Sequence, residues 1–288
     1  MTNRLESKVA LVAGAGRGIG RAIALAFARE GASVVLVART RSEIDVVCAE
    51  CRSVGAIAEA VTADVANDGQ VVAAMEAADR LGPLDVLVNA AGVYGPIGPT
   101  WEIDADAWRA AIDINLDGTF LLCREALARM VKAGSGAVIL LGGGGATAAL
   151  PRLSAYAASK AGVARLAETL AEETQEFGIR INVVAPGLVD TRLQDEVLAA
   201  GARAGALFEK VKDARATGAG TVPPTVAADL AVFLASDESG PLTGKLISAP
   251  HDPWREWGPR ADELNRSPLF TLRRLDPFTI RPLLEELA

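Results

Sequence analysis

Short apolar runs alternate along the chain with longer segments of helical periodicity, and this alternation restricts the fold more than any other feature. The runs lie at 9–13, 33–37, 58–64, 84–89, 137–141 and 180–185, with a seventh expected at 245–248. Helix-like segments occupy the intervals, at 18–30, 41–54, 67–80, 104–132 and 155–177. Strands that are apolar at nearly every position indicate burial on both faces of a sheet. The sequence therefore predicts a doubly wound α/β fold with a parallel sheet of about seven strands.

Two regions depart from this alternation. Residues 188–224 begin with LVDTRLQDEVLAAG and end at VPP, and we expect them to form a mobile lid or a short helix pair over the carboxyl edge of the sheet. Residues 249–288 contain prolines at 250, 253, 259, 268, 277 and 282, which exclude a long helix, while their aromatic residues argue against disorder. We predict one dinucleotide-binding domain over 1–248 and a C-terminal extension, 249–288, that packs on the same domain or on a neighbouring subunit.

Charge and hydropathy exclude two classes of partner. The formal net charge is −7 and the chain has no Lys/Arg-rich run, so we expect no nucleic-acid binding. Charged residues at positions 4, 6 and 8 precede only a short apolar run, which fits neither a signal peptide nor a membrane span. The sequence therefore predicts a cytoplasmic protein without membrane association.

Cysteine and histidine content gives no sign of a metal site. Cys48 and Cys51 form a C-x-x-C pair, but no second pair exists, and His251 is the single histidine. Zinc sites need four such ligands at closer spacing. We expect no bound metal and interpret both cysteines, with Cys123, as ordinary residues in a reducing compartment.

A glycine-rich turn follows the first strand directly. The strand at 9–13 runs into GAGRGIG at 14–20 and then into the helix-like RAIALAFARE. Small residues let the backbone approach a pyrophosphate, and the helix N-terminus offers free N–H groups with a favourable dipole. This order of strand, turn and helix predicts a dinucleotide site.

The residues after the second strand favour one dinucleotide. NAD sites of this type place an acidic residue about 20 positions beyond the glycines, where it binds the ribose hydroxyls. Here the segment reads VARTR at 37–41, so Arg39 stands where the acid is expected. A guanidinium suits a 2′-phosphate, and Arg17 in the turn is placed to reach the same group. We therefore predict NADP rather than NAD, the alternative being that both arginines are solvated surface charges.

Tyr156 and Lys160 are four residues apart, so they share one face of a helix. A phenol has an ordinary pKa of about 10, and a nearby cation stabilises its ionised form. The pair suits proton transfer to or from an alcohol or carbonyl oxygen.

Together these motifs resemble the short-chain dehydrogenase/reductase family over roughly residues 5–248. The turn resembles the family's T-G-x-x-x-G-x-G with alanine at 13, and Tyr156 and Lys160 match its Y-x-x-x-K. The other matches are the acid Asp64 with Val65, the N-A-A-G element at 89–92, Asn115 in INLDGTF, the P-G motif at 186–187, and Thr191. The resemblance implies a Rossmann fold. The cofactor residues that follow from the resemblance and from the arginine argument together are Gly14, Arg17, Gly18, Ile19, Gly20, Arg39, Asp64, Val65, Asn89, Ala90, Gly92, Tyr156, Lys160, Pro186, Gly187, Val189 and Thr191.

The resemblance also implies catalytic roles. Tyr156 would be the general acid/base, Lys160 would lower its pKa and bind the nicotinamide ribose, and Asn115 would hold a water in a proton relay. The activity implied is an NADP-dependent interconversion of a secondary alcohol and a carbonyl. Family members pack through the helices that carry Asn115 and Tyr156, so we expect a homodimer or homotetramer.

One family feature is missing. A serine some 13 residues before the tyrosine usually binds the substrate oxygen, but that count ends at Gly143, between Gly142 and Gly144. Three explanations remain open: glycine N–H groups, Thr147 or Ser154 replace the hydroxyl; the substrate brings its own hydrogen-bonding group; or the chain is a non-catalytic NADP(H)-binding regulator or partner subunit. On the first explanation, serine at 142 or 143 should raise turnover.

The expected substrate loops are 93–101, 143–154 and 188–215, and they are rich in Ala, Gly, Leu and Val. No cluster of charges for a phosphate or carboxylate stands out among them. We therefore expect a small-molecule carbonyl or alcohol that is mainly apolar.

Overall fold

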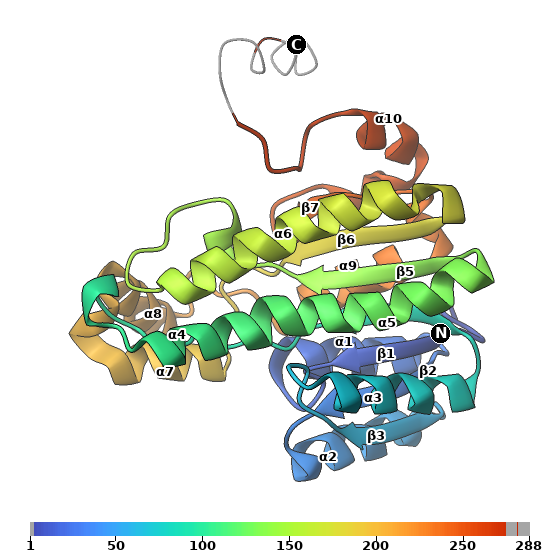
Figure 1. Ribbon diagram of the computed structural model, residues 1–288, viewed down its shortest axis with the longest axis horizontal. Helices are drawn as coiled ribbons and strands as arrows, with labels where there is room; N and C mark the ends of the chain where they lie inside the picture. The colour runs from blue at the N-terminus through green and yellow to red at the C-terminus, as the bar shows by residue number, and fades with distance from the viewer. Residues whose placement is uncertain (1–2, 275–280, 282–288) are drawn as a thin grey trace.

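The computed structural model describes residues 3–274 and 281, and it contains a seven-stranded parallel sheet in the order β3-β2-β1-β4-β5-β6-β7 (Figure 1). The strands are β1 (Val9–Ala13), β2 (Ser33–Ala38), β3 (Ala58–Thr62), β4 (Leu84–Asn89), β5 (Gly136–Leu141), β6 (Ile179–Ala185) and β7 (Leu246–Ser248). The order reverses between β1 and β4, as in doubly wound sheets. The predicted Rossmann-type fold is confirmed.

Helices cover both faces of the sheet. One layer consists of α1 (Gly18–Arg29), α2 (Arg41–Ser53) and α9 (Pro224–Ala235), and the other of α3 (Asp68–Leu81), α5 (Gly118–Ala133) and α6 (Ser154–Thr174). Figure 1 shows the second layer in front of the strands. Along β1, Ala10 and Val12 join the core on one face, while Val9 and Leu11 join the core on the other. Burial on both faces explains why the strands are apolar throughout.

The segment 104–132, expected as one helix, is divided into two. Helix α4 (Ala105–Ile112) passes through a π-helical turn, Asp113–Asp117, into α5. Such turns insert an extra residue into the helix and often occur at functional sites. Here the turn carries Asn115, which is fully buried.

The region 188–224 forms a helix pair, one of the two structures expected for it. Helices α7 (Arg192–Ala200) and α8 (Ala206–Thr217) pack against each other beyond the carboxyl ends of the strands (Figure 1). An isolated bridge between Leu188 and Thr221 closes the base of this pair.

The described part of the C-terminal extension packs on the same chain. Trp254 and Trp257 are each only 3% exposed, and Trp257 packs against Phe270 with ring centroids 4.4 Å apart and the rings tilted by 46°. The backbone N–H of Leu246 donates to the carbonyl of Phe270 at 2.7 Å, so the extension also bonds to β7. Helix α10 (Ala261–Arg266) is short, as the prolines require. The prolines at 277 and 282 lie outside the described residues, and the boundary at 248 stays a prediction.

Two other expectations concern membranes and metals. Within the described residues, no helix combines the length and the apolar composition that a bilayer crossing requires. The same part of the chain holds no group of three or more potential metal ligands.

Candidate active site

A cavity of about 590 Å³ lies at the carboxyl ends of the strands, at the point where the strand order reverses. This is the place where doubly wound folds bind dinucleotides. The predicted cofactor residues that line it are Gly14, Arg17, Gly18, Ile19, Gly20, Arg39, Asp64, Val65, Ala90, Gly92 and Thr191.

The glycine turn has the geometry that a phosphate site needs. A Cβ atom on Gly14 would lie 2.6 Å from the Ala90 backbone, and one on Gly20 would lie 2.2 Å from the carbonyl of Gly14. Helix α1 begins at Gly18, and the side chain of Arg17, its N-cap, makes no capping hydrogen bond. The first N–H groups of the helix are therefore left for an anion at the cavity, and the residues present fit a dinucleotide.

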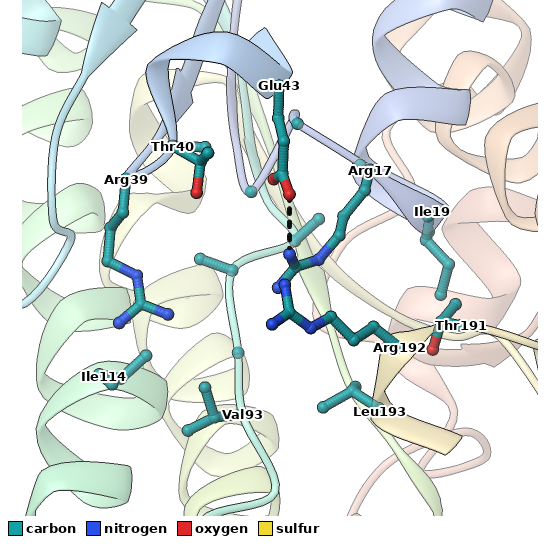
Figure 2. A pocket seen from close by; sticks show the side chains of 18 of the residues that line it. Arg17, Ile19, Arg39, Thr40, Glu43, Val93, Ile114, Thr191, Arg192 and Leu193 are labelled. Atoms are coloured by element: carbon teal, nitrogen blue, oxygen red, sulfur yellow. Dashed lines mark hydrogen bonds and ion pairs between the residues drawn. The ribbon is translucent and has the colours of Figure 1, made fainter. Parts of the chain in front are cut away.

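Charged side chains surround the same cavity. Arg17 Nη1 pairs with Glu43 Oε1 at 3.0 Å, and the two side chains are 49% and 33% exposed. Figure 2 shows Arg192 beside Arg17, with Arg39 on the opposite side of the pocket. Glu43 lies in the first turn of α2 and was not expected here. A carboxylate therefore does stand in this pocket, although none ends the second strand.

The other predicted cofactor residues lie around the cavity rather than in its lining. Asn89 is buried below it, where its Nδ2 donates to Thr119 Oγ1 at 2.8 Å and its Oδ1 accepts from the N–H of Ala91. Pro186 and Val189 are buried after β6, next to Gly187, whose φ of +79° favours glycine.

Tyr156, Lys160 and Asn115 come together behind one wall of the cavity. A Cβ on Gly92, which lines the cavity, would lie 3.2 Å from Asn115 Oδ1 and 3.6 Å from Lys160 Nζ. Lys160 Nζ donates to the carbonyl of Leu141 at 2.7 Å and lies 5.8 Å from the centre of the Tyr156 ring. The three predicted catalytic residues therefore adjoin the predicted cofactor site.

Asn115 is held by several hydrogen bonds. Its Oδ1 accepts from the N–H of Val93 at 2.9 Å, and its Nδ2 donates to Val93 O and to Ser159 Oγ, both at 2.9 Å. Its backbone carbonyl accepts from the Thr119 hydroxyl at 2.6 Å. The side chain thus fixes the loop after β4 to α6, a function that the sequence did not reveal.

Burial controls the proton affinities of the site. It raises the pKa of the Tyr156 phenol well above its ordinary value, and the nearby Tyr94 raises it further. It also lowers the pKa of Lys160 to about 8. Burial therefore outweighs the lowering of the Tyr156 pKa that was expected from Lys160.

The glycine run leaves room for the tyrosine hydroxyl. A Cβ on Gly143 would lie 2.2 Å from Tyr156 Oη, whereas one on Gly144 would meet no atom within 4 Å. Of the two proposed substitutes for the serine, Thr147 is exposed and Ser154 Oγ accepts a hydrogen bond from Trp108 Nε1 at 3.2 Å.

Two buried polar residues near Tyr156 were not predicted. The ring of Tyr94 packs edge-on against Tyr156, with centroids 4.8 Å apart, and Gln194 Nε2 donates to Tyr94 Oη at 3.3 Å. The signal for Tyr94 was its place two residues after the N-A-A-G element. Gln194 is on α7, and only the fold brings it to Tyr94.

Comparison with known proteins decides the family. The model of the short-chain dehydrogenase family matches residues 8–201. The chain belongs to this family. D-threitol dehydrogenase of Mycolicibacterium smegmatis is 38% identical to this short-chain dehydrogenase over 242 residues, which cover 84% of this chain and 90% of that enzyme.

Solved structures of similar proteins agree with this assignment. NAD⁺-bound xylitol dehydrogenase superposes with a TM-score of 0.79 at 25% identity, covering 85% of this chain and 98% of its own. A gluconate 5-dehydrogenase from Burkholderia cenocepacia, in complex with NADP and tartrate, gives a TM-score of 0.76 at 30% identity, with 86% and 95% covered. This short-chain dehydrogenase is thus an NAD(P)-dependent oxidoreductase that acts on alcohols or carbonyls.

Proposed function

We propose that the protein is an NADP-dependent oxidoreductase that interconverts a secondary alcohol and a ketone, with Tyr156 as its general acid/base. The observation that carries this proposal is the placement of Lys160 beside Gly92, which lines the cavity, together with the position of the Tyr156 ring 5.8 Å from Lys160 Nζ. A phenol and an ammonium at this place suit proton transfer to a substrate oxygen.

The bound cofactor supplies or accepts a hydride, and the chain's own residues manage the proton. Burial keeps the Tyr156 phenol protonated at neutral pH because its pKa is raised, so it is ready to donate its proton to a carbonyl oxygen. The Lys160 ammonium stabilises the phenolate that remains, and Leu141 O holds it in place. Asn115 fixes the loop after β4 through the backbone of Val93, next to Gly92 at the cavity.

We propose NADP as the preferred dinucleotide because Arg39 and Arg17 flank the cavity beyond β2 (Figure 2). Within the described residues, Arg39 forms no ion pair, so its guanidinium is free to bind a 2′-phosphate. Glu43 opposes this preference, because a carboxylate repels a phosphate and suits ribose hydroxyls. Similar proteins have been solved with NAD⁺ and with NADP, so the arginines of this chain carry the argument.

We propose a mainly apolar substrate. Tyr156 lies in a buried apolar cluster whose side chains come from several segments, among them Leu153, Val197 and Val211. Two of the three relatives named above are dehydrogenases of D-threitol and xylitol, which are polyols. A polyol bound against this apolar cluster would leave most of its hydroxyls without hydrogen-bond partners, at a cost of about 1–3 kcal/mol for each.

We further propose that the protein is a cytoplasmic homodimer or homotetramer. Cys48, Cys51 and Cys123 are all free and buried, as a reducing compartment allows. Phe120 of α5 is a large apolar side chain on the surface of the isolated chain, which suits a subunit contact. Light scattering coupled to gel filtration would measure the assembly, and a monomer would contradict this proposal.

The test of the proposed function combines binding and turnover. We expect NADPH to bind more tightly than NADH in fluorescence titrations, and cyclic ketones to be reduced faster than keto-sugars. Tyr156→Phe should retain binding and lose nearly all turnover. Binding without turnover on any ketone, unchanged in Tyr156→Phe, would instead support the non-catalytic regulator.

A further inference from the structure

The proposed reaction requires more than one hydrogen-bond donor at the substrate oxygen. Donors aimed at the developing oxyanion contribute a factor of about 10² to 10³ to turnover each. Gly143 has no side chain and Thr147 is exposed, while Ser154 and Tyr94 each accept one hydrogen bond through their hydroxyl oxygen and keep a proton to donate. The following inference rests on the proposed function and concerns the group that supplies the missing donor.

Tyr94 has the position that such a donor needs. It follows the loop after β4 that Asn115 fixes, and it is only 8% exposed. Its ring contacts the Tyr156 ring edge-on, so both phenols belong to one buried cluster with Leu153 and Val197. Tyr94 is therefore the phenol that lies beside the proposed general acid/base.

Gln194 determines which way the Tyr94 hydroxyl can point. Its Nε2 donates to Tyr94 Oη at 3.3 Å, so this oxygen acts as an acceptor and its own proton remains to be donated. Among the described residues, no acceptor for that proton lies within hydrogen-bond distance. Burial raises the pKa of Tyr94, which keeps the proton on the phenol at neutral pH.

The same pair has an unused polar atom. Gln194 is 7% exposed, yet its Oε1 has no hydrogen-bond partner in the part of the chain that the structure describes. A buried polar group without a partner costs free energy, and native structures rarely keep one without a functional reason.

We propose that Tyr94 is a second catalytic residue, whose hydroxyl donates a hydrogen bond to the substrate oxygen in place of the absent serine, and that Gln194 is its positioning residue. Tyr94 keeps its proton throughout, while Tyr156 transfers its own. The glycine at 143 then matters because it leaves space for the Tyr156 hydroxyl, and the polarising donor comes from the neighbouring phenol.

The test uses substitutions that keep the size and shape of each side chain. Tyr94→Phe should lower kcat about 100-fold, while the KM for the ketone and the Kd for NADPH change less than threefold. Gln194→Glu introduces a carboxylate that accepts the Tyr94 proton, so it should lower kcat to a similar extent. Gln175→Glu, the same change at an exposed position after α6, is the matched control and should leave kcat unaltered. Thermal melting of every variant checks the fold.

A binding measurement keeps the inference testable even if no ketone is turned over. Cyclohexanecarboxamide is an unreactive carbonyl compound, and its Kd for the NADPH-loaded protein can be measured by the change in NADPH fluorescence. Tyr94→Phe should weaken this binding about tenfold. An active wild type whose Tyr94→Phe variant keeps its kcat would overturn the inference, as would equal amide binding by both forms. Absence of turnover in the wild type with amide binding that depends on Tyr94 would overturn the proposed function alone.

Discussion

At the scale of single residues, Gly143 matters to the candidate active site because it has no side chain. Its φ of 176° is extended backbone, so its conformation does not require glycine. The requirement comes from Tyr156, whose hydroxyl lies where a Cβ would stand. The sequence led us to expect that serine at this position would raise turnover, and the geometry argues for the opposite result.

Gly143→Ala should therefore lower kcat by about 10²-fold, because a displacement of about 1 Å in a reacting group has an effect of that size. Gly144→Ala is the matched control, since a Cβ there meets nothing within 4 Å, and it should leave kcat unchanged. Steady-state kinetics on a ketone would measure both. Equal rates for wild type and Gly143→Ala would show that Tyr156 has room to move.

The Lys160 ammonium predicts a pH dependence. Burial lowers its pKa to about 8, so the cation is present below that pH and is lost as the pH rises through it. Ketone reduction should thus fall above about pH 8 with one ionisation. Lys160→Arg should move this decline to higher pH, because a guanidinium stays charged. A decline that stays in place in Lys160→Arg, with thermal melting unchanged over the range, would assign it to another group.

At the scale of elements, helix α2 contributes the charge that the sequence did not reveal. Its first turn brings Glu43 back toward the glycine turn, where the carboxylate pairs with Arg17 (Figure 2). A 2′-phosphate must compete with Glu43 for Arg17, whereas a ribose hydroxyl can donate to the carboxylate. The first turn of α2 is thus placed to influence the choice of dinucleotide.

Glu43→Gln should lower the Kd for NADPH two- to fivefold and should not lower the Kd for NADH. The expected change in Kd corresponds to roughly 0.5–1 kcal/mol, which is the free energy that a partly exposed ion pair contributes. Asp45→Asn is the control on the same helix, because Asp45 pairs with the exposed Arg41 instead. Fluorescence titration of each variant gives the result, and weaker NADPH binding by Glu43→Gln would show that the carboxylate helps to order the site.

Prediction from the sequence was most accurate where the residue pattern itself carries the signal. The strands at 9–13 and 84–89 end where expected, because buried parallel strands are apolar runs between turns. Helix α9 went unpredicted since nearly all of its residues from 227 to 235 are buried, which leaves no amphipathic pattern to read. The π-helical turn at Asn115 is also invisible in the pattern, because apolar residues continue on both sides of it.

The same contrast between local pattern and tertiary packing applies to the candidate site. Residues that share a local motif, such as the glycine turn or Tyr156 with Lys160, can be found from spacing alone. Glu43, Tyr94 and Gln194 depend on how separate helices and loops meet, so no local spacing reveals them. The raised pKa of Tyr156 likewise depends on burial, which arises only when the surrounding segments pack together in the folded chain.

At the scale of the whole molecule, the C-terminal extension closes one end of the sheet. Trp254 packs on Phe233 of α9, and Lys245 Nζ donates to the carbonyls of Ser267 and Leu269 at 2.7 and 3.2 Å. Glu168 of α6 accepts from the N–H of Leu272 at 2.6 Å. The extension is therefore bonded to the sheet and to helices of both layers.

Removal of residues 250–288 should destabilise the domain and cause aggregation, because loss of a buried tryptophan costs about 3–5 kcal/mol. A truncation after Arg274 keeps every contact named above and serves as the control. Thermal melting and light scattering would compare the two. A melting temperature unchanged by the longer deletion would mean that the extension does not stabilise the domain.

The bond between Leu246 and Phe270 also affects how molecules meet one another. A sheet whose last strand faces solvent offers a row of unpaired amides to any strand that approaches, and such rows promote fibre growth. Here the C-terminal extension lies along the edge of β7, and Lys245 bonds to the extension. Copies of the protein that associate on this side must therefore recognise one another through side chains, and continuous polymers of strands are prevented there.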